Sequence, residues 1–159
     1  MIPSPVDDAV VMPTAQHQLD TYLDKFAPEI AAHARAVLDR ARCFVPGAIE
    51  LVYDNDHALV VSFGSTTRAA DAVLSVAVYP RWVTLFLMHG AAVDDPFNLL
   101  HGTGSEVRGV RIKSLAQFDD EHLQMLVEAA VAMAPKPIDE KRERLLVIKS
   151  VSEQQRPRR

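Results

Sequence analysis

Hydrophobic positions recur every three or four residues in three stretches of the chain, residues 19–26, 30–41 and 123–131. Side chains with that spacing lie on one face of a helix. Pro28 and Asp119 stand where the second and third stretches begin, and both residue types are favoured at helix starts. The pattern predicts two helices before Pro46 and a third that ends before Pro135.

Five further stretches have the length and composition of β-strands, residues 49–53, 58–63, 72–79, 82–88 and 106–112. The polar tetrad Asp54–Asn55–Asp56–His57 suits a hairpin turn, and Pro80 marks a second turn because proline cannot donate a ladder hydrogen bond. The connections are short, and a parallel crossover needs a dozen or more residues, so we expect mostly antiparallel neighbours. The chain is predicted to be an α+β domain, a two-layer sandwich in which N-terminal and C-terminal helices pack on one face of a mostly antiparallel sheet of about five strands.

Composition divides the chain into three parts. Residues 1–13 contain three prolines and are expected to be an irregular lead-in, residues 14–135 form the α+β domain, and residues 136–159 form a charged C-terminal tail. The tail carries eight lysines and arginines against four acidic residues, which leaves a net charge of −8 on the other 135 residues. An acidic body repels nucleic acid, so we expect no nucleic-acid partner and a solvated tail. Within the tail, only residues 145–151 suggest an ordered element.

The sequence also argues against several broad classes of protein. It has no run of about 18 uncharged apolar residues, so we expect no membrane span. The N-terminal segment lacks a basic start followed by an apolar stretch, which favours a cytoplasmic protein over a secreted one. Cys43 is the only cysteine, which excludes an intrachain disulfide and a cysteine-rich metal site. No Gly-x-Ser-x-Gly motif occurs and no histidine neighbours Cys43, so we expect no enzymatic activity.

Two of the predicted strands, residues 72–79 and 82–88, are apolar on both faces. An antiparallel sheet that carries helices on one side normally shows polar residues on the other. Something should therefore cover the second face, and four candidates are open: the lead-in segment, the loop around Phe97, a partner subunit or a ligand. This face is the best indication of a binding surface that the sequence offers.

Four segments of the chain carry a family resemblance: FAPEI at residues 26–30, AIELVYDN at 48–55, YPRWV at 79–83 and GTGSEVR at 102–108. Together they resemble the YdhG-like family of small domains, most of which have no known function. The resemblance covers roughly residues 20–134 and implies an α+β fold related to the frataxin-like group. Two positions depart from the family pattern: Tyr53 is followed by Asp54–Asn55–Asp56 rather than Gly-Met-Pro, and Ser105 stands where many members have lysine.

Some members of this family are described as iron chaperones, so the resemblance implies iron as a candidate cofactor, although no ligand motif carries over residue by residue. Carboxylate and imidazole side chains suit iron, manganese or zinc, and the candidate metal residues are Glu50, Asp54, Asp56 and His57. Their spacing lacks the glycine and the terminal glutamate of a calcium loop. The alternative is a plain hairpin turn, in which Asp and Asn are favoured for backbone reasons, and the sequence favours the turn.

A second set of candidates would bind an organic ligand. The loop of residues 102–105 offers backbone amides that suit an anion, and an arginine–tryptophan pair at a strand edge is typical of binding hot spots. The alternatives, a structural turn and a half-buried tryptophan that packs on the sheet, are favoured. The candidate ligand-binding residues are Tyr79, Arg81, Trp82, His101, Gly102, Gly104 and Arg108. Among them, His101, Arg108 and Arg81 are expected to converge.

The favoured interpretation is a non-enzymatic binding domain that takes a small ligand or a protein partner at the second sheet face and its bordering loops. Two alternatives stay open. One is a frataxin-like protein that binds and delivers iron through exposed carboxylates, and the other is a structural domain that homodimerises through the second face. The chain is accordingly expected to be a monomer or a homodimer.

Overall fold

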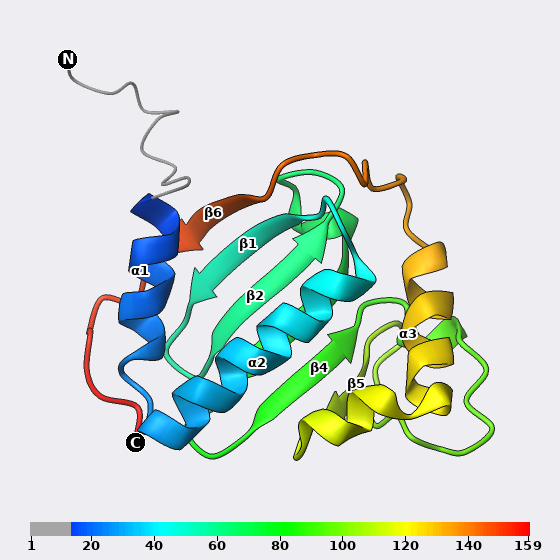
Figure 1. Ribbon diagram of the computed structural model, residues 1–159, viewed down its shortest axis with the longest axis horizontal. Helices are drawn as coiled ribbons and strands as arrows, with labels where there is room; N and C mark the ends of the chain where they lie inside the picture. The colour runs from blue at the N-terminus through cyan, green and yellow to red at the C-terminus, as the bar shows by residue number, and fades with distance from the viewer. Residues whose placement is uncertain (1–13) are drawn as a thin grey trace.

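A six-stranded sheet and three α-helices make up the computed structural model, which describes residues 14–159 (Figure 1). The helices are α1 (Thr14–Leu23), α2 (Pro28–Phe44) and α3 (Glu121–Ala132). The strands are β1 (Ile49–Asp54), β2 (Leu59–Gly64), β3 (Ala72–Val78), β4 (Val83–Leu87), β5 (Arg108–Arg111) and β6 (Leu145–Ser150). Three short 3-10 helices lie in the connections, η1 (Ala69–Asp71), η2 (Gly90–Ala92) and η3 (Leu115–Asp119). The lead-in expected at residues 1–13 lies outside the described residues.

The strands follow the order β5-β4-β3-β2-β1-β6 across the sheet, and every neighbouring pair is antiparallel except β1 and β6. Helix α2 runs along the middle of one face, with α1 and α3 towards its two sides (Figure 1). The predicted α+β class and two-layer arrangement are confirmed. The sheet has six strands rather than about five, because β6 adds a parallel strand beside β1.

One hydrophobic core fills the space between the helices and the sheet. The apolar stripes seen in the sequence supply it: Leu19 and Leu23 from α1, Leu38 from α2 and Leu126 from α3 are all buried. Burial of one such side chain contributes roughly 1.5–3 kcal/mol. The helical stripes therefore fix all three helices on the same face of the sheet.

Strand β6 lies in the segment that the sequence assigned to a charged tail. Its Leu146 and Ile148 are buried in the main core, and Val147 is buried on the opposite face of the sheet. Strand β6 is therefore apolar on both sides: Leu146 and Ile148 face the main core, and Val147 packs with Ile49 and Leu51 on the other face. The ordered element suggested at residues 145–151 is thus strand β6 and belongs to the folded domain, so the expectation of a solvated tail fails for this part of it.

No helix of the described residues covers the second face of the sheet. Strand alternation and register place Leu51, Ser62 and Ser75 in one row across this face. The hydroxyl groups of Ser62 and Ser75 are hydrogen-bonded to each other at 2.7 Å. Ile49, Leu51 and Val147 form a small hydrophobic cluster there, separate from the main core. The second face thus has a polar centre that the two apolar strands alone did not suggest.

Candidate functional site

The predicted ligand-binding residues are divided between the two ends of strand β4. The hairpin that holds Tyr79, Arg81 and Trp82 precedes β4, and Tyr79 N–H donates to the Trp82 carbonyl at 2.9 Å. Arg108 pairs with Leu87 at the far end of the strand. At ~3.3 Å per residue the two ends of β4 lie roughly 13 Å apart. Because β4 and β5 are antiparallel, the hairpin and the glycine loop lie at opposite ends, so the expected convergence of Arg81 with Arg108 is not observed.

The glycine loop is closed by its own side chains. The Arg108 guanidinium donates to the carbonyls of Gly104 and Val107. His101 pairs with Gly109 through two backbone hydrogen bonds of 2.7 and 2.8 Å, which continues the sheet edge. These contacts match the structural-turn interpretation of the loop. Arg108 is occupied in holding the loop rather than held ready for an anion.

Trp82 has a cationic partner that the sequence did not reveal. The Arg111 guanidinium carbon lies 4.3 Å from the centroid of the Trp82 ring. The ring centroids of Tyr79 and Trp82, which lie on the same hairpin, are 5.2 Å apart. Arg111 pairs with Thr84 in the β4–β5 ladder, so only the strand register brings it to the tryptophan. A cation over an aromatic face stabilises such a pair by roughly 0.5–1 kcal/mol at an exposed site.

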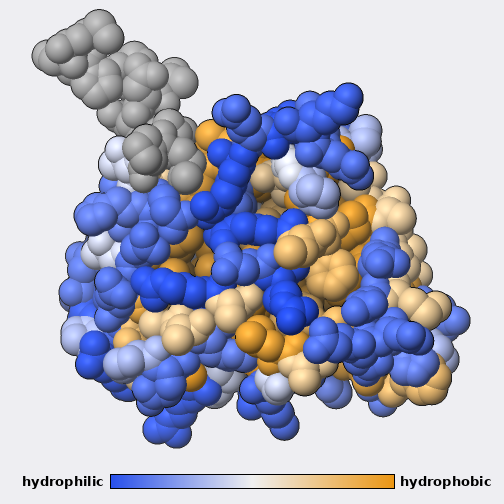
Figure 2. Space-filling model, in the orientation of Figure 1, coloured by the Kyte–Doolittle hydropathy of each residue, from blue (hydrophilic) through white to orange (hydrophobic). Residues whose placement is uncertain are grey.

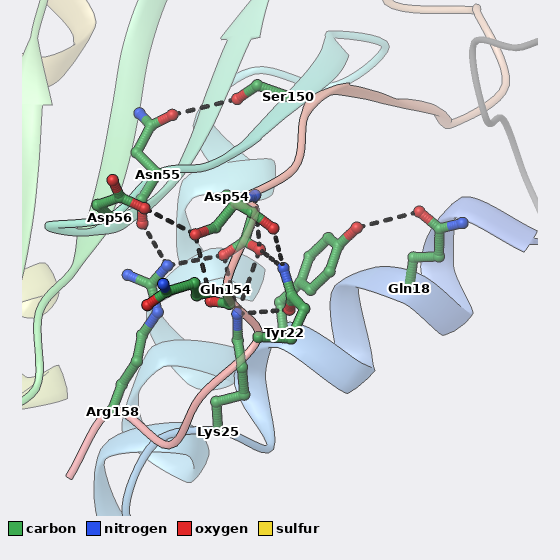
Figure 3. Close-up of polar contacts among 11 residues, drawn as sticks. Gln18, Tyr22, Lys25, Asp54, Asn55, Asp56, Ser150, Gln154 and Arg158 are labelled. Atoms are coloured by element: carbon green, nitrogen blue, oxygen red, sulfur yellow. Dashed lines mark hydrogen bonds and ion pairs between the residues drawn. The ribbon is translucent and has the colours of Figure 1, made fainter.

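The predicted metal ligand Asp54 is the centre of a buried ion-pair cluster (Figure 3). Its carboxylate accepts hydrogen bonds from Lys25 Nζ at 3.1 and 3.2 Å, from Arg158 at 2.8 Å and from Gln155 at 2.7 Å. Burial raises the pKa of the neighbouring Tyr22 phenol, and the Asp54 charge raises it further. We call this arrangement the Asp54 clasp, because it ties residues 155–158 to the junction of α1 and α2.

The other predicted metal ligands do not join Asp54 in one site. Glu50 lies four residues earlier on β1, roughly 13 Å away at ~3.3 Å per residue, and its carboxylate is held by Arg42 and Arg144. Asp56 accepts a hydrogen bond from the Ser152 hydroxyl at 2.7 Å, and His57 is exposed. Across residues 14–159, no group of three or more His, Cys, Asp or Glu side chains is arranged to hold a metal ion. The predicted four-residue metal site is therefore corrected to two separate ion-pair clusters.

An open, largely apolar hollow flanks helix α3 and was not predicted. It encloses about 310 Å³ between α3 and the loop that follows η2. Phe97, Met125 and Met133 line it and are 57%, 66% and 41% exposed. They are three of the five exposed large hydrophobic side chains in the described part of the chain. We call this hollow the α3 groove.

The loop that forms one wall of the α3 groove is held in shape by polar contacts. The Asp95 carboxylate accepts hydrogen bonds from the backbone N–H groups of Leu99 at 3.0 Å and Leu100 at 2.9 Å. Asn98 adopts a left-handed backbone with φ of 54°, a conformation that asparagine tolerates better than most residues. The Phe97 ring then packs on the His122 ring with centroids 3.9 Å apart. These contacts fix the shape of the wall.

Helix α3 is apolar on two sides. One side enters the core through Leu123, Leu126, Val127 and Ala130, and the groove side presents Met125, Ala129 and Met133. A second hollow of about 310 Å³ separates the end of α2 from the end of α3. Figure 2 shows this apolar surface between the two helices, framed by charged side chains. Helices that are apolar nearly all round are normally buried, so the groove side of α3 has the character of a contact surface.

Comparison with family models, with curated proteins and with solved structures finds no match for this chain. The resemblance to the YdhG-like family therefore stays a prediction. Within residues 14–159, no helix combines the length and the apolar composition needed to cross a bilayer.

Proposed function

We propose that this protein is a non-enzymatic binding domain whose α3 groove receives a basic amphipathic segment of a protein partner. The observation that carries the proposal is the clustering of Phe97, Met125 and Met133, which leaves large apolar surface in water at one place. Contiguous exposed apolar patches on a folded domain mark interaction sites. Burial of each of these side chains by a partner contributes roughly 1.5–3 kcal/mol to binding.

The shape and composition of the α3 groove favour a peptide segment over a small molecule. Its volume of about 310 Å³ is at the lower limit of ordinary ligand pockets, roughly 300–1,000 Å³. Two of its side chains, Met125 and Met133, are unbranched thioethers, which adapt to the side chains of different peptides. A groove along a helix fits the mode in which an amphipathic helix places its apolar face against a partner.

The charges at the α3 groove favour a basic partner. Asp94 and Asp95 line it, and of the described residues that line it none is lysine or arginine. Glu121 and Glu128 are exposed on α3 on either side of Met125. An acidic rim around an apolar floor attracts a segment with lysine or arginine beside its apolar residues, and it accelerates their encounter.

The proposal is tested by adding helical model peptides to the full-length 15N-labelled chain and following 1H–15N NMR spectra. A leucine–lysine peptide is expected to shift signals of residues 92–99 and of α3, and a leucine–glutamate peptide of equal length is not. A Met125→Glu variant is expected to bind the leucine–lysine peptide about tenfold more weakly, because the apolar floor is lost. Val151→Glu, at an exposed apolar position outside the groove, is the matched control.

Two results would contradict the proposal. One is equal binding of the leucine–lysine and leucine–glutamate peptides, which would show that the protein binds apolar helices whatever their charge. The other is a set of shifts centred on Trp82 and Phe86, which would transfer the binding surface to the second face of the sheet.

Homodimerisation through the second face is the second candidate. It is favoured by the absence of a covering helix over this face within residues 14–159 and by the exposed Trp82 at its margin. Sedimentation equilibrium over a range of concentrations tests it, and a monomer mass that does not change with concentration would exclude it.

A further inference from the structure

Two arginines share one buried carboxylate beneath the end of helix α2. Glu50 is buried, and its side chain accepts from Arg42 Nε at 3.1 Å and from Arg42 Nη2 at 2.9 Å. Arg144 adds Nε at 2.8 Å and Nη2 at 3.3 Å from the other side. Both carboxylate oxygens of Glu50 therefore accept hydrogen bonds from Arg42 and Arg144. The carboxylate fixes two guanidinium groups that would otherwise sample many rotamers.

The charges around Glu50 do not balance. Arg42, Arg142 and Arg144 bring three positive charges to this region, and Glu50 neutralises only one. Asp39 accepts from Arg42 Nη1 at 2.7 Å, but its side chain is 75% exposed, so water screens that pair. Of the described residues that line the hollow between the end of α2 and β1, three are arginines and Glu50 alone is acidic, so its lining is positively charged.

The arginine donors are only partly used. Arg144 binds Glu50 side-on through Nε and Nη2, and its Nη1 has no hydrogen-bond partner among the described residues. A guanidinium engaged side-on keeps the Nη1–Nη2 edge for a second oxyanion, because its five N–H donors form a planar fork. Arg142 donates from Nη1 to the Ser65 carbonyl at 3.0 Å and keeps its Nη2 donors.

Two hollows meet at these arginines. One encloses about 260 Å³ between α1 and α2, and the other about 220 Å³ between the end of α2 and β1. Arg42 and Arg144 line both, and Arg142 lines the smaller one together with the exposed Pro46. The smaller hollow therefore combines guanidinium groups with one accessible apolar side chain.

We propose that the smaller hollow binds a small organic carboxylate. The carboxylate contacts Arg144 and Arg142, and a short apolar chain lies against Pro46. An anion matches the positively charged lining, and a carboxylate matches the fork geometry of a guanidinium. Glu50 acts as a positioning residue that holds Arg144 in place before the ligand arrives, which lowers the entropic cost of binding.

The test uses the full-length 15N-labelled protein and sodium butyrate as the probe. Butyrate is expected to shift backbone signals of residues 45–50 and 142–144 and the arginine side-chain signals. Butyramide has the same chain without the charge, and it is expected to leave these signals unchanged. Inorganic phosphate, an oxyanion without an apolar chain, is expected to bind more weakly than butyrate.

Variants identify the residues that bind. Arg142→Gln is expected to weaken butyrate binding about tenfold, because it removes a charged donor and leaves the Glu50 pairs intact. Arg144→Lys keeps the charge and loses the fork, so a similar loss is expected. Lys149→Gln removes one charge from β6 outside the hollow and is expected to bind like the wild type. Equal loss in Arg142→Gln and Lys149→Gln, with Arg144→Lys binding like the wild type, would reduce the effect to net charge and overturn the proposal. Equal shifts from butyrate and butyramide would overturn it as well.

Discussion

An Asp54→Asn variant is expected to lose about 3 kcal/mol of unfolding free energy, because it leaves two buried cations without their counter-charge. The Asp54 side chain is fully buried, and those of Lys25 and Arg158 are only 11% and 9% exposed. Asparagine has the size of aspartate, so no cavity forms. Its amide nevertheless presents N–H donors to a site that already holds lysine and arginine donors.

Urea denaturation followed by circular dichroism measures this loss. Asp56→Asn is the matched control, because Asp56 is an exposed carboxylate two residues further along the chain whose hydrogen bond comes from the Ser152 hydroxyl. It is expected to change the stability by less than about 0.5 kcal/mol. Similar losses in both variants would show that the Asp54 clasp adds no more than a surface hydrogen bond.

The same pair of variants separates the Asp54 clasp from an iron site. If Asp54 binds ferrous iron, an anaerobic titration of the wild type perturbs the signals of residues 54–57, and Asp54→Asn abolishes the effect without loss of stability. If the clasp is the role of Asp54, the stability falls and the wild type gives no selective response to ferrous iron. The structure favours the second result, because Lys25 and Arg158 already neutralise the carboxylate.

A Gly47→Ala variant is expected to lose at least about 3 kcal/mol, from backbone strain and a steric clash together. Gly47 has a φ of +79°, and an added Cβ would lie 1.9 Å from the carbonyl oxygen of Asp139. A left-handed backbone alone costs an L-residue roughly 1–2 kcal/mol. The clashing atom belongs to the backbone of the connection between α3 and β6, so relief requires that connection to move.

Gly104→Ala supplies the contrast, since an added Cβ there meets no atom within 4 Å. The change is expected to be neutral or slightly stabilising, within about 0.5 kcal/mol, because alanine reduces the freedom of the unfolded chain. Thermal and urea unfolding of both variants measure the difference. Equal stability of the two would show that the chain around Asp139 adapts freely to Gly47.

The sequence predicts the parts of this fold that depend on local pattern. The stripes at residues 30–41 and 123–131 lie within α2 and α3, the stripe at 19–26 begins in α1 and continues past its end at Leu23, and the antiparallel hairpins follow from short connections. Local pattern does not predict that residues 145–150 join the sheet, because six residues in a charged segment give only a weak signal for a strand. Only the pairing of β6 with β1, far away in the sequence, buries Leu146 and Ile148.

The sites were harder to predict than the fold for the same reason. Asp54 and Arg158 are 104 residues apart, so no local pattern distinguishes a buried ion pair from a polar turn. The α3 groove did leave a signal, since Met125, Ala129 and Met133 follow one another at intervals of four residues. Whether such a stripe faces the core or solvent depends on which side of the helix packs on the sheet.

The parallel pairing of β6 with β1 has a consequence during synthesis. Ile49 is made 96 residues before its partner Leu145, which at ~5–20 residues per second is a delay of roughly 5–20 s. For that time β1 is an open strand edge, and such edges invite pairing with other chains. Of the charged partners described above, Glu50 and Asp54 then have only Arg42 and Lys25, because Arg144 and Arg158 do not yet exist. Charged side chains on a strand edge disfavour its pairing with strands of other chains. Glu50 and Asp54, which later hold β6 and the segment after it, therefore also protect the incomplete sheet from aggregation.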